Sequence, residues 1–279
     1  MLYPSDCVNK IINRIIWVTQ KSIEVEENRA RRKEELKEKI RKNNFLMDKI
    51  QKAKSISIWI FIVPFVAINS CLILITQFHG LFPNQEEIIH WTLPYIDGGA
   101  SISRTARPYP SWLIFKPGMF LTAFLLIKYW LYSKEIIIYF NKDHKHLKKI
   151  IFFGIGSAIA LTIHSIFLGI KFDNDLYKLF RRVIMVVFII FEITAQAYLI
   201  TALYSSKDKL LNYINVKILK AKLILVVCLI IVAIIAVPII SMPGNHFKFL
   251  KHGLEWNYFL GVITFYMLTF FMWKVRKGK

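Results

Sequence analysis

The chain has little of what a catalytic or disulfide-stabilised protein needs. Its 279 residues include only three cysteines, Cys7, Cys71 and Cys228, with no Cys-x-x-Cys pair and no zinc-type spacing to histidine. Neither a disulfide framework nor a zinc site is therefore predicted. Gly-x-Ser-x-Gly, His-Glu-x-x-His and paired catalytic carboxylates are also missing. These absences favour a protein without catalytic chemistry, and we expect no metal and no cofactor.

Acidic residues are scarce too, with 18 Asp and Glu against 38 Lys and Arg, which gives a net charge of +20. In a soluble protein this excess would indicate a nucleic-acid partner. However, 55% of the residues are hydrophobic and the mean hydropathy is +0.44, which is too apolar for a soluble domain of this length. We therefore expect no nucleic-acid partner. The expected partners are anionic lipid head groups, which attract each basic residue near the membrane surface by ~1 kcal/mol.

The apolar residues gather in six windows, each close to the ~20 residues that a helix needs to cross a bilayer. The windows are residues 55–78, 112–131, 150–170, 183–203, 223–240 and 256–272. Continuous apolar runs without alternation exclude a β-barrel. The predicted fold class is therefore all-α, a polytopic membrane protein in which residues 55–274 form a six-transmembrane-helix bundle.

The distribution of Lys and Arg predicts the orientation, because basic residues are retained on the cytoplasmic side. With the amino terminus inside, the cytoplasmic segments hold 28 of these residues and the outer loops hold 8. Lys222 is counted among the cytoplasmic ones, in the segment 205–222. We expect a multi-pass protein of the plasma (inner) membrane with both termini, including the tail 275–279, in the cytoplasm.

Residues 1–54 precede the first window and are predicted to be helical. Apolar residues at positions 8, 11, 12, 15 and 16 have helical spacing, which is typical of a helix in the membrane interface. The following run, 24–54, is dense in Glu, Lys and Arg and has no Gly or Pro. It predicts one long charged helix that leads into the first span. This basic segment is also a candidate site for a protein partner or for oligomerisation.

Three polar residues inside the windows predict a buried cluster. Glu192 lies about ten residues past Arg181 and Arg182, Gln196 follows one turn later on the same face, and His164 lies at comparable depth. A charge at the bilayer centre costs ~2.5–3.5 kcal/mol, so it tends to face the protein interior. Two interpretations stay open: a proton-sensitive or head-group-binding centre, or interhelical hydrogen bonds that only fix packing.

The outer loop, residues 79–111, is long for a connection between two helices and is predicted to fold over the end of the bundle. Asp97 and the two glycines after it predict a turn, and serines and arginines follow within eight residues. Such groups can bind an anionic head group. Alternatively, Asp97 pairs with an arginine to fix the loop. The candidate ligand-binding residues are Asp97, Gly98, Gly99, Ser101, Ser103, Arg104 and Arg107.

Two short motifs resemble the Frag/DRAM/Sfk family of six-span membrane proteins. Tyr95-Ile96-Asp97-Gly98-Gly99 is similar to the Ile-Ser-Asp-x-Gly type signature of the loop after span one. Glu255-Trp256 is similar to the acidic-aromatic pair that begins the last helix in that family. The likeness in topology covers about residues 55–274. No Ser precedes Asp97, and Arg107-Pro108-Tyr109-Pro110 replaces the usual Pro-Glu, so the resemblance is to a divergent bacterial branch. It implies a role in membrane-lipid biology without a common catalytic chemistry.

The sequence leaves three functions open. The first is a non-catalytic accessory or regulatory role linked to membrane lipids, with the outer loop as the binding site. The second is a small-solute or proton-coupled transporter that uses Glu192 and His164. The third is a membrane-embedded lipid hydrolase, which would need a His and Asp set to coordinate zinc on adjoining helices, although only His164 lies deep in a span.

Overall fold

The computed structural model describes residues 4–78, 81–83, 85, 88–142, 144–170, 174–241 and 247–274. The predicted tail 275–279, parts of the outer loop and the side chains of residues 8, 11, 12 and 15 lie outside this description. The chain is 83% helical, and the described residues contain no strand. The all-α prediction is therefore confirmed.

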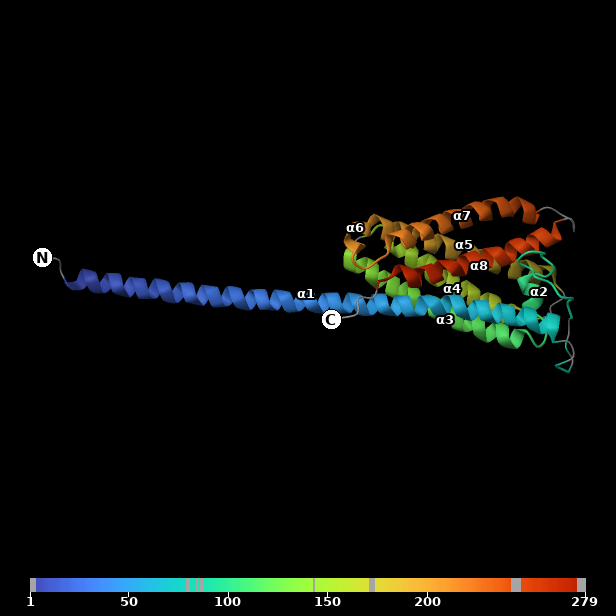
Figure 1. The fold of residues 1–279 in the computed structure, drawn as a ribbon, viewed down its shortest axis with the longest axis horizontal. Coiled ribbons are helices and arrows are strands. Elements are labelled where there is room, and N and C mark those ends of the chain that lie inside the picture. The colour runs from blue at the N-terminus through green and yellow to red at the C-terminus, as the bar shows by residue number, and fades with distance from the viewer. Residues whose placement is uncertain are drawn as a thin grey trace. The chain divides into compact units, whose positions relative to one another are not determined.

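Eight helices follow one another along the described chain (Figure 1). They are α1 (Pro4–Gln77), α2 (Ile102–Ala106), α3 (Trp112–Phe140), α4 (Leu147–Phe167), α5 (Asp175–Ser205), α6 (Lys207–Leu210), α7 (Val216–Ser241) and α8 (Lys248–Met272). Five of them, α1, α3, α4, α5 and α7, are long and apolar enough to cross a membrane. The window 256–272 lies within α8, which is not among these five.

The described chain divides into two compact units, residues 1–48 and 49–279. In the first unit, the predicted charged helix is present as part of α1, and it carries the expected pairs of opposite charge. Lys37 contacts Glu34 at 2.7 Å and Lys42 contacts Glu38 at 2.6 Å. Because these side chains are largely exposed, each pair stabilises the helix by at most ~0.5 kcal/mol.

The second unit is a helix bundle whose outward side chains are apolar. Phe152 on α4 is 64% exposed, and Ile224 and Ile234 on α7 are 64% and 67% exposed. Polar Ser157, Glu192 and Gln196 are instead at most 1% exposed. A water-soluble bundle would place these two kinds of side chain the other way round. The arrangement is that of a protein surrounded by hydrocarbon.

Helix α4 packs between α3 and α5, α5 also packs on α7, and α7 packs on α8 (Figure 1). Small residues permit the close approaches, as is common between transmembrane helices. A Cβ atom on Gly154 of α4 would collide with the indole ring of Trp130 on α3, and one on Gly156 would collide with the ring of Phe191 on α5.

The bundle has two distinct ends. At the first, which we call the Trp273 end, Ile214 and Trp273 form an isolated antiparallel bridge, and Lys54 Nζ donates to the Trp273 carbonyl oxygen at 2.9 Å. Lys49 forms a 2.8 Å ion pair with Glu135 on α3. The other end, which we call the loop end, holds the loop between α1 and α3 and the start of α8. It contains the candidate residues of the outer loop.

Candidate functional site

Asp97 closes the turn at the loop end by accepting hydrogen bonds from its own segment. Its Oδ1 accepts from the Thr92 hydroxyl at 2.6 Å and the Gly99 amide at 2.8 Å, and its Oδ2 accepts from the Leu93 amide at 2.8 Å. Gly98 has φ +64°, where glycine meets no steric penalty. The turn predicted at Asp97 is confirmed. Partial burial works against ionisation, but these hydrogen bonds outweigh it and hold the pKa of Asp97 below its usual value.

The turn is fixed to the start of α8 through its carbonyl oxygens. Side chains of α8 donate to three of them, and the pairs are His252 Nδ1 to Gly98 at 2.9 Å, Trp256 Nε1 to Ala100 at 2.8 Å and Asn257 Nδ2 to Tyr95 at 2.8 Å. The rings of Tyr95 and Trp256 also meet edge to face, with centroids 4.9 Å apart. The segments 95–99 and 255–256, on which the resemblance expected from the sequence rests, therefore contact each other.

Glu255 caps the short helix α2. Its carboxylate accepts hydrogen bonds from the backbone N–H groups of Ile102 and Ser103, while burial raises its pKa to about 7. The Ser101 hydroxyl accepts from the Arg104 amide at 3.2 Å and lies 3.3 Å from the Ser103 hydroxyl. The amides and hydroxyls that the sequence offered as ligand-binding groups thus serve mainly to shape the loop.

Basic side chains from two helices gather at this end. Arg104 on α2 and Lys248 on α8 both lie near His252, and we call these three residues the loop-end basic cluster. Burial and then the two positive charges lower the pKa of His252, although its hydrogen bond to Gly98 opposes the change. Arg107, the other predicted arginine, is exposed, and its carbonyl group lies beside Gly169 after α4. An anion at the cluster would relieve the repulsion between its members.

A second group of polar residues lies inside the bundle, around Glu192 on α5. The carboxylate accepts from Ser157 Oγ of α4 at 2.7 Å, from Gln196 Nε2 at 3.0 Å and from the Tyr266 hydroxyl of α8. Gln196 Nε2 also lies 3.3 Å from the Val262 carbonyl oxygen. Glu192 is 1% exposed and Gln196 is fully buried. We call Ser157, Glu192, Gln196 and Tyr266 the Glu192 network; it connects three helices.

His164 was predicted to join this cluster, and the structure places it elsewhere. It lies on α4 about 10 Å along the helix from Ser157, and its charged neighbour is Arg181. Its Nδ1 has no hydrogen-bond partner among the described residues. Of the three predicted residues, the structure thus joins Glu192 and Gln196 by a hydrogen bond, and His164 makes none to either within the described chain.

Lys222 is a buried basic residue within the segment 205–222, which is predicted to be cytoplasmic. It is fully buried, its Nζ donates to Thr269 Oγ1 of α8 at 2.7 Å, and it lies 3.8 Å above the ring of Phe265. The Thr269 hydroxyl is also 3.5 Å from the Tyr129 hydroxyl of α3. In the structure Lys222 falls in the inward stripe of α7, together with the buried residues at positions 219, 226 and 229.

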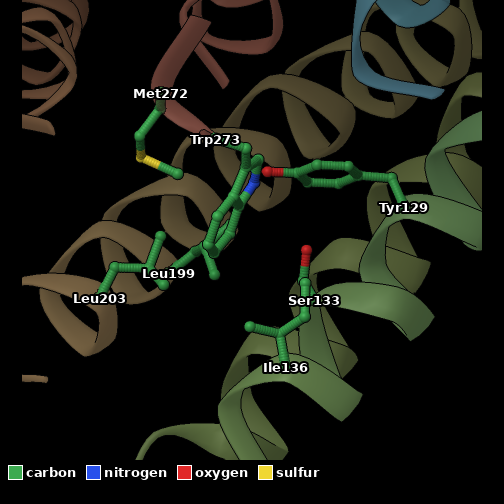
Figure 2. A pocket seen from close by; sticks show the side chains of 7 residues that line it. All are labelled: Tyr129, Ser133, Ile136, Leu199, Leu203, Met272 and Trp273. Atoms are coloured by element: carbon green, nitrogen blue, oxygen red, sulfur yellow. The ribbon is translucent and has the colours of Figure 1, made fainter. Parts of the chain in front are cut away.

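Tyr129 leads from this group to a small cavity near the Trp273 end. Figure 2 shows its hydroxyl pointing toward the indole of Trp273, with the Ser133 hydroxyl directed into the space between α3 and α5. The cavity has a volume of about 10 Å³, which is the size of one water molecule. Its lining residues are Tyr129, Ser133, Ile136, Leu199, Leu203, Met272 and Trp273.

The side chains of the described residues include no group of three or more His, Cys, Asp and Glu that is placed to hold a metal ion. The sequence does not predict four residues of these two polar groups, because their partners are far away in the chain. These residues are Ser157, Lys222, Tyr266 and Thr269.

Comparisons of the sequence and the fold with known protein families, with characterised proteins and with solved structures returned no match.

Proposed function

We propose that this chain is a non-catalytic, lipid-associated protein of the plasma (inner) membrane that binds an anionic lipid head group at the loop-end basic cluster. In this proposal α8 forms the sixth span, the loop end faces outward, and both termini lie in the cytoplasm. The distribution of 28 basic residues on one side and 8 on the other supports that orientation.

The observation that carries the proposal is the convergence of Arg104, Lys248 and His252. Three cationic or titratable groups come from two helices, and the hydrogen bonds from α8 to the loop hold α2 in place beside them. A phosphate group suits this set, since Arg offers a planar pair of N–H donors and Lys a point charge. The cluster lies where the last helix meets the membrane surface in this topology, at the depth of lipid head groups.

A role in lipid biology is also what the resemblance of two motifs to the Frag/DRAM/Sfk family implies. The two motifs that carry it, Tyr95-Ile96-Asp97-Gly98-Gly99 and Glu255-Trp256, lie together beside the cluster. In this proposal, the motif residues position the loop, and the basic side chains contact the lipid.

The test is native mass spectrometry of the full-length protein titrated with phosphatidylglycerol and with zwitterionic phosphatidylcholine. We expect selective binding of phosphatidylglycerol, and the double variant Arg104→Gln, Lys248→Gln should weaken it by roughly tenfold or more, because hydrogen bonds to charged groups contribute ~1.5–3 kcal/mol each. A parallel titration with inorganic phosphate separates head-group binding from binding of the free anion.

The matched control is Lys217→Gln, Lys220→Gln, which removes the same charge from exposed positions near the start of α7. This variant should keep the selectivity of the wild type. Equal losses in the two double variants would show that only net charge matters and would contradict the proposal, as would tight binding of free phosphate without binding of the lipid.

A further inference from the structure

The carboxylate of Glu192 has three hydrogen-bond donors around its two oxygens. Gln196 and Tyr266 both donate to Oε1, and Ser157 faces Oε2. This set satisfies the ionised side chain. An uncharged amide at this position could also connect the three helices, and it would avoid the cost of burying a charge in the membrane. The presence of a carboxyl group therefore needs its own explanation.

The Ser157 hydroxyl supplies that explanation, because it faces two acceptors and has one hydrogen. Its oxygen lies 2.7 Å from Glu192 Oε2 and 2.8 Å from the Gly154 carbonyl oxygen, one turn earlier on α4. When Glu192 is ionised, Ser157 donates to Oε2. When Glu192 is protonated, its O–H donates to Ser157 Oγ, and the serine hydrogen turns to the Gly154 carbonyl. Both states are fully hydrogen-bonded without movement of any heavy atom.

We infer that Glu192 is a reversible proton-binding site in the centre of the bundle and that the Ser157 hydroxyl is the rotor that accommodates both of its states. In the binding step, a hydronium ion gives up a proton and becomes water, the proton forms the O–H bond at Oε2, and the carboxylate loses its negative charge. No covalent bond of the protein is broken. Oε1 stays the acceptor for Gln196 and Tyr266 in both states.

Helices α3, α4, α7 and α8 carry the titratable groups that bear on Glu192 among the described residues. On α4 the nearest in sequence is His164, two turns from Ser157, and on α8 it is Tyr266 itself. Tyr129 of α3 packs its ring against Tyr266, with centroids 5.0 Å apart, and reaches Lys222 of α7 through Thr269. Among the described residues, Lys222 is thus a basic group that contacts of Thr269, Tyr129 and Tyr266 connect to the surroundings of Glu192. This site is separate from the loop-end basic cluster, so either proposal can fail alone.

The test is infrared difference spectroscopy of the full-length protein in bilayers, recorded as the pH is changed. We expect the carbonyl band of a protonated carboxylic acid to appear as the pH falls and to be absent in Glu192→Gln. Ser157→Ala removes the donor to the ionised form, so it should move the midpoint of this band upward by about one pH unit, a tenfold gain in proton affinity.

The matched control is Ser165→Ala. Ser165 lies two turns further along α4, is equally buried, and donates only to the Leu161 carbonyl oxygen at 2.8 Å. Its loss should leave the midpoint unchanged. Equal shifts in the two serine variants would overturn the role of Ser157. A band that persists in Glu192→Gln, or no titrating band in the wild type, would overturn the proton-binding site.

Discussion

The indole Nε1 of Trp256 donates a 2.8 Å hydrogen bond to the carbonyl oxygen of Ala100, which lies 156 positions earlier in the chain. Both residues are fully buried. This bond joins the first loop of the bundle to its last helix and sets the position of α2 with Arg104. The loop end is therefore one built structure, assembled from segments that are distant in sequence.

Removing this bond should loosen the loop. In Trp256→Phe the Ala100 carbonyl stays buried without its donor, which costs ~1–3 kcal/mol. We expect trypsin to cleave after Arg104 several times faster than in the wild type. Trp91→Phe is the control, because Trp91 is 74% exposed. Equal cleavage rates in the two variants would mean that the hydrogen bond does not hold the loop.

Glu255 should make the stability of the loop end depend on pH. Its pKa in the folded protein is about 7, above the ordinary value of 4.5, so the folded state binds this proton more tightly than the unfolded state does. Its contribution is thus full below pH 4.5 and is lost as the pH rises through 7. The melting temperature of the wild type relative to Glu255→Gln should fall between pH 5 and pH 8.

That experiment must compare the melting temperatures of the wild type and Glu255→Gln at each pH, because other groups also titrate in this range. His252 has a lowered pKa and contributes with the opposite sign, but it is present in both proteins. Asp97, whose pKa is already below its usual value, stays ionised over this range. A constant difference in melting temperature from pH 5 to pH 8 would contradict the assignment to Glu255.

Lys222 and Thr269 should be strongly coupled. Thr269→Val leaves the buried amine without its 2.7 Å hydrogen bond, and we expect it to lower the free energy of unfolding by ~1–3 kcal/mol. In a Lys222→Met background the same change should cost under ~0.5 kcal/mol, since the partner is gone. A double-mutant cycle measures the coupling. Additive effects of the two changes would show that the contact contributes nothing.

The close packing of α3 on α4 should depend on the absence of a side chain at Gly154. A Cβ atom at Gly154 would collide with the ring of Trp130, so Gly154→Ala should lower stability by ~1–3 kcal/mol through overpacking. Gly253→Ala is the control on α8, because its new Cβ would come no nearer than 3.7 Å to Pro94. That change should be neutral or stabilising. Thermal unfolding in detergent compares the two, and a harmless Gly154→Ala would refute the packing argument.

The class of the protein and most of its elements follow from the sequence because hydrocarbon imposes simple rules. Backbone groups must pair within each helix, so apolar windows of about twenty residues predict helices. Asp97 with two glycines predicts the turn, and the four-residue spacing of Glu192 and Gln196 predicts their contact. Each of these relationships is local in the chain.

The remaining features depend on which helices are neighbours, and no local pattern contains that information. The sequence gives no sign that Tyr266 and Ser157 meet Glu192 from two other helices. The burial of Lys222 was not predicted, because this residue directly precedes an apolar run and follows Lys217 and Lys220, as a residue at a membrane boundary would. Only the packing of α7 against α8 explains its burial.

The most direct test of the central claim is a cryo-electron microscopy map of the full-length protein in nanodiscs that contain phosphatidylglycerol. We predict density for a phosphate head group within hydrogen-bond distance of Arg104, Lys248 or His252, and its loss when the lipid is phosphatidylcholine alone. A loop end without such density, or the same density in both lipids, would contradict selective binding of an anionic head group at this site.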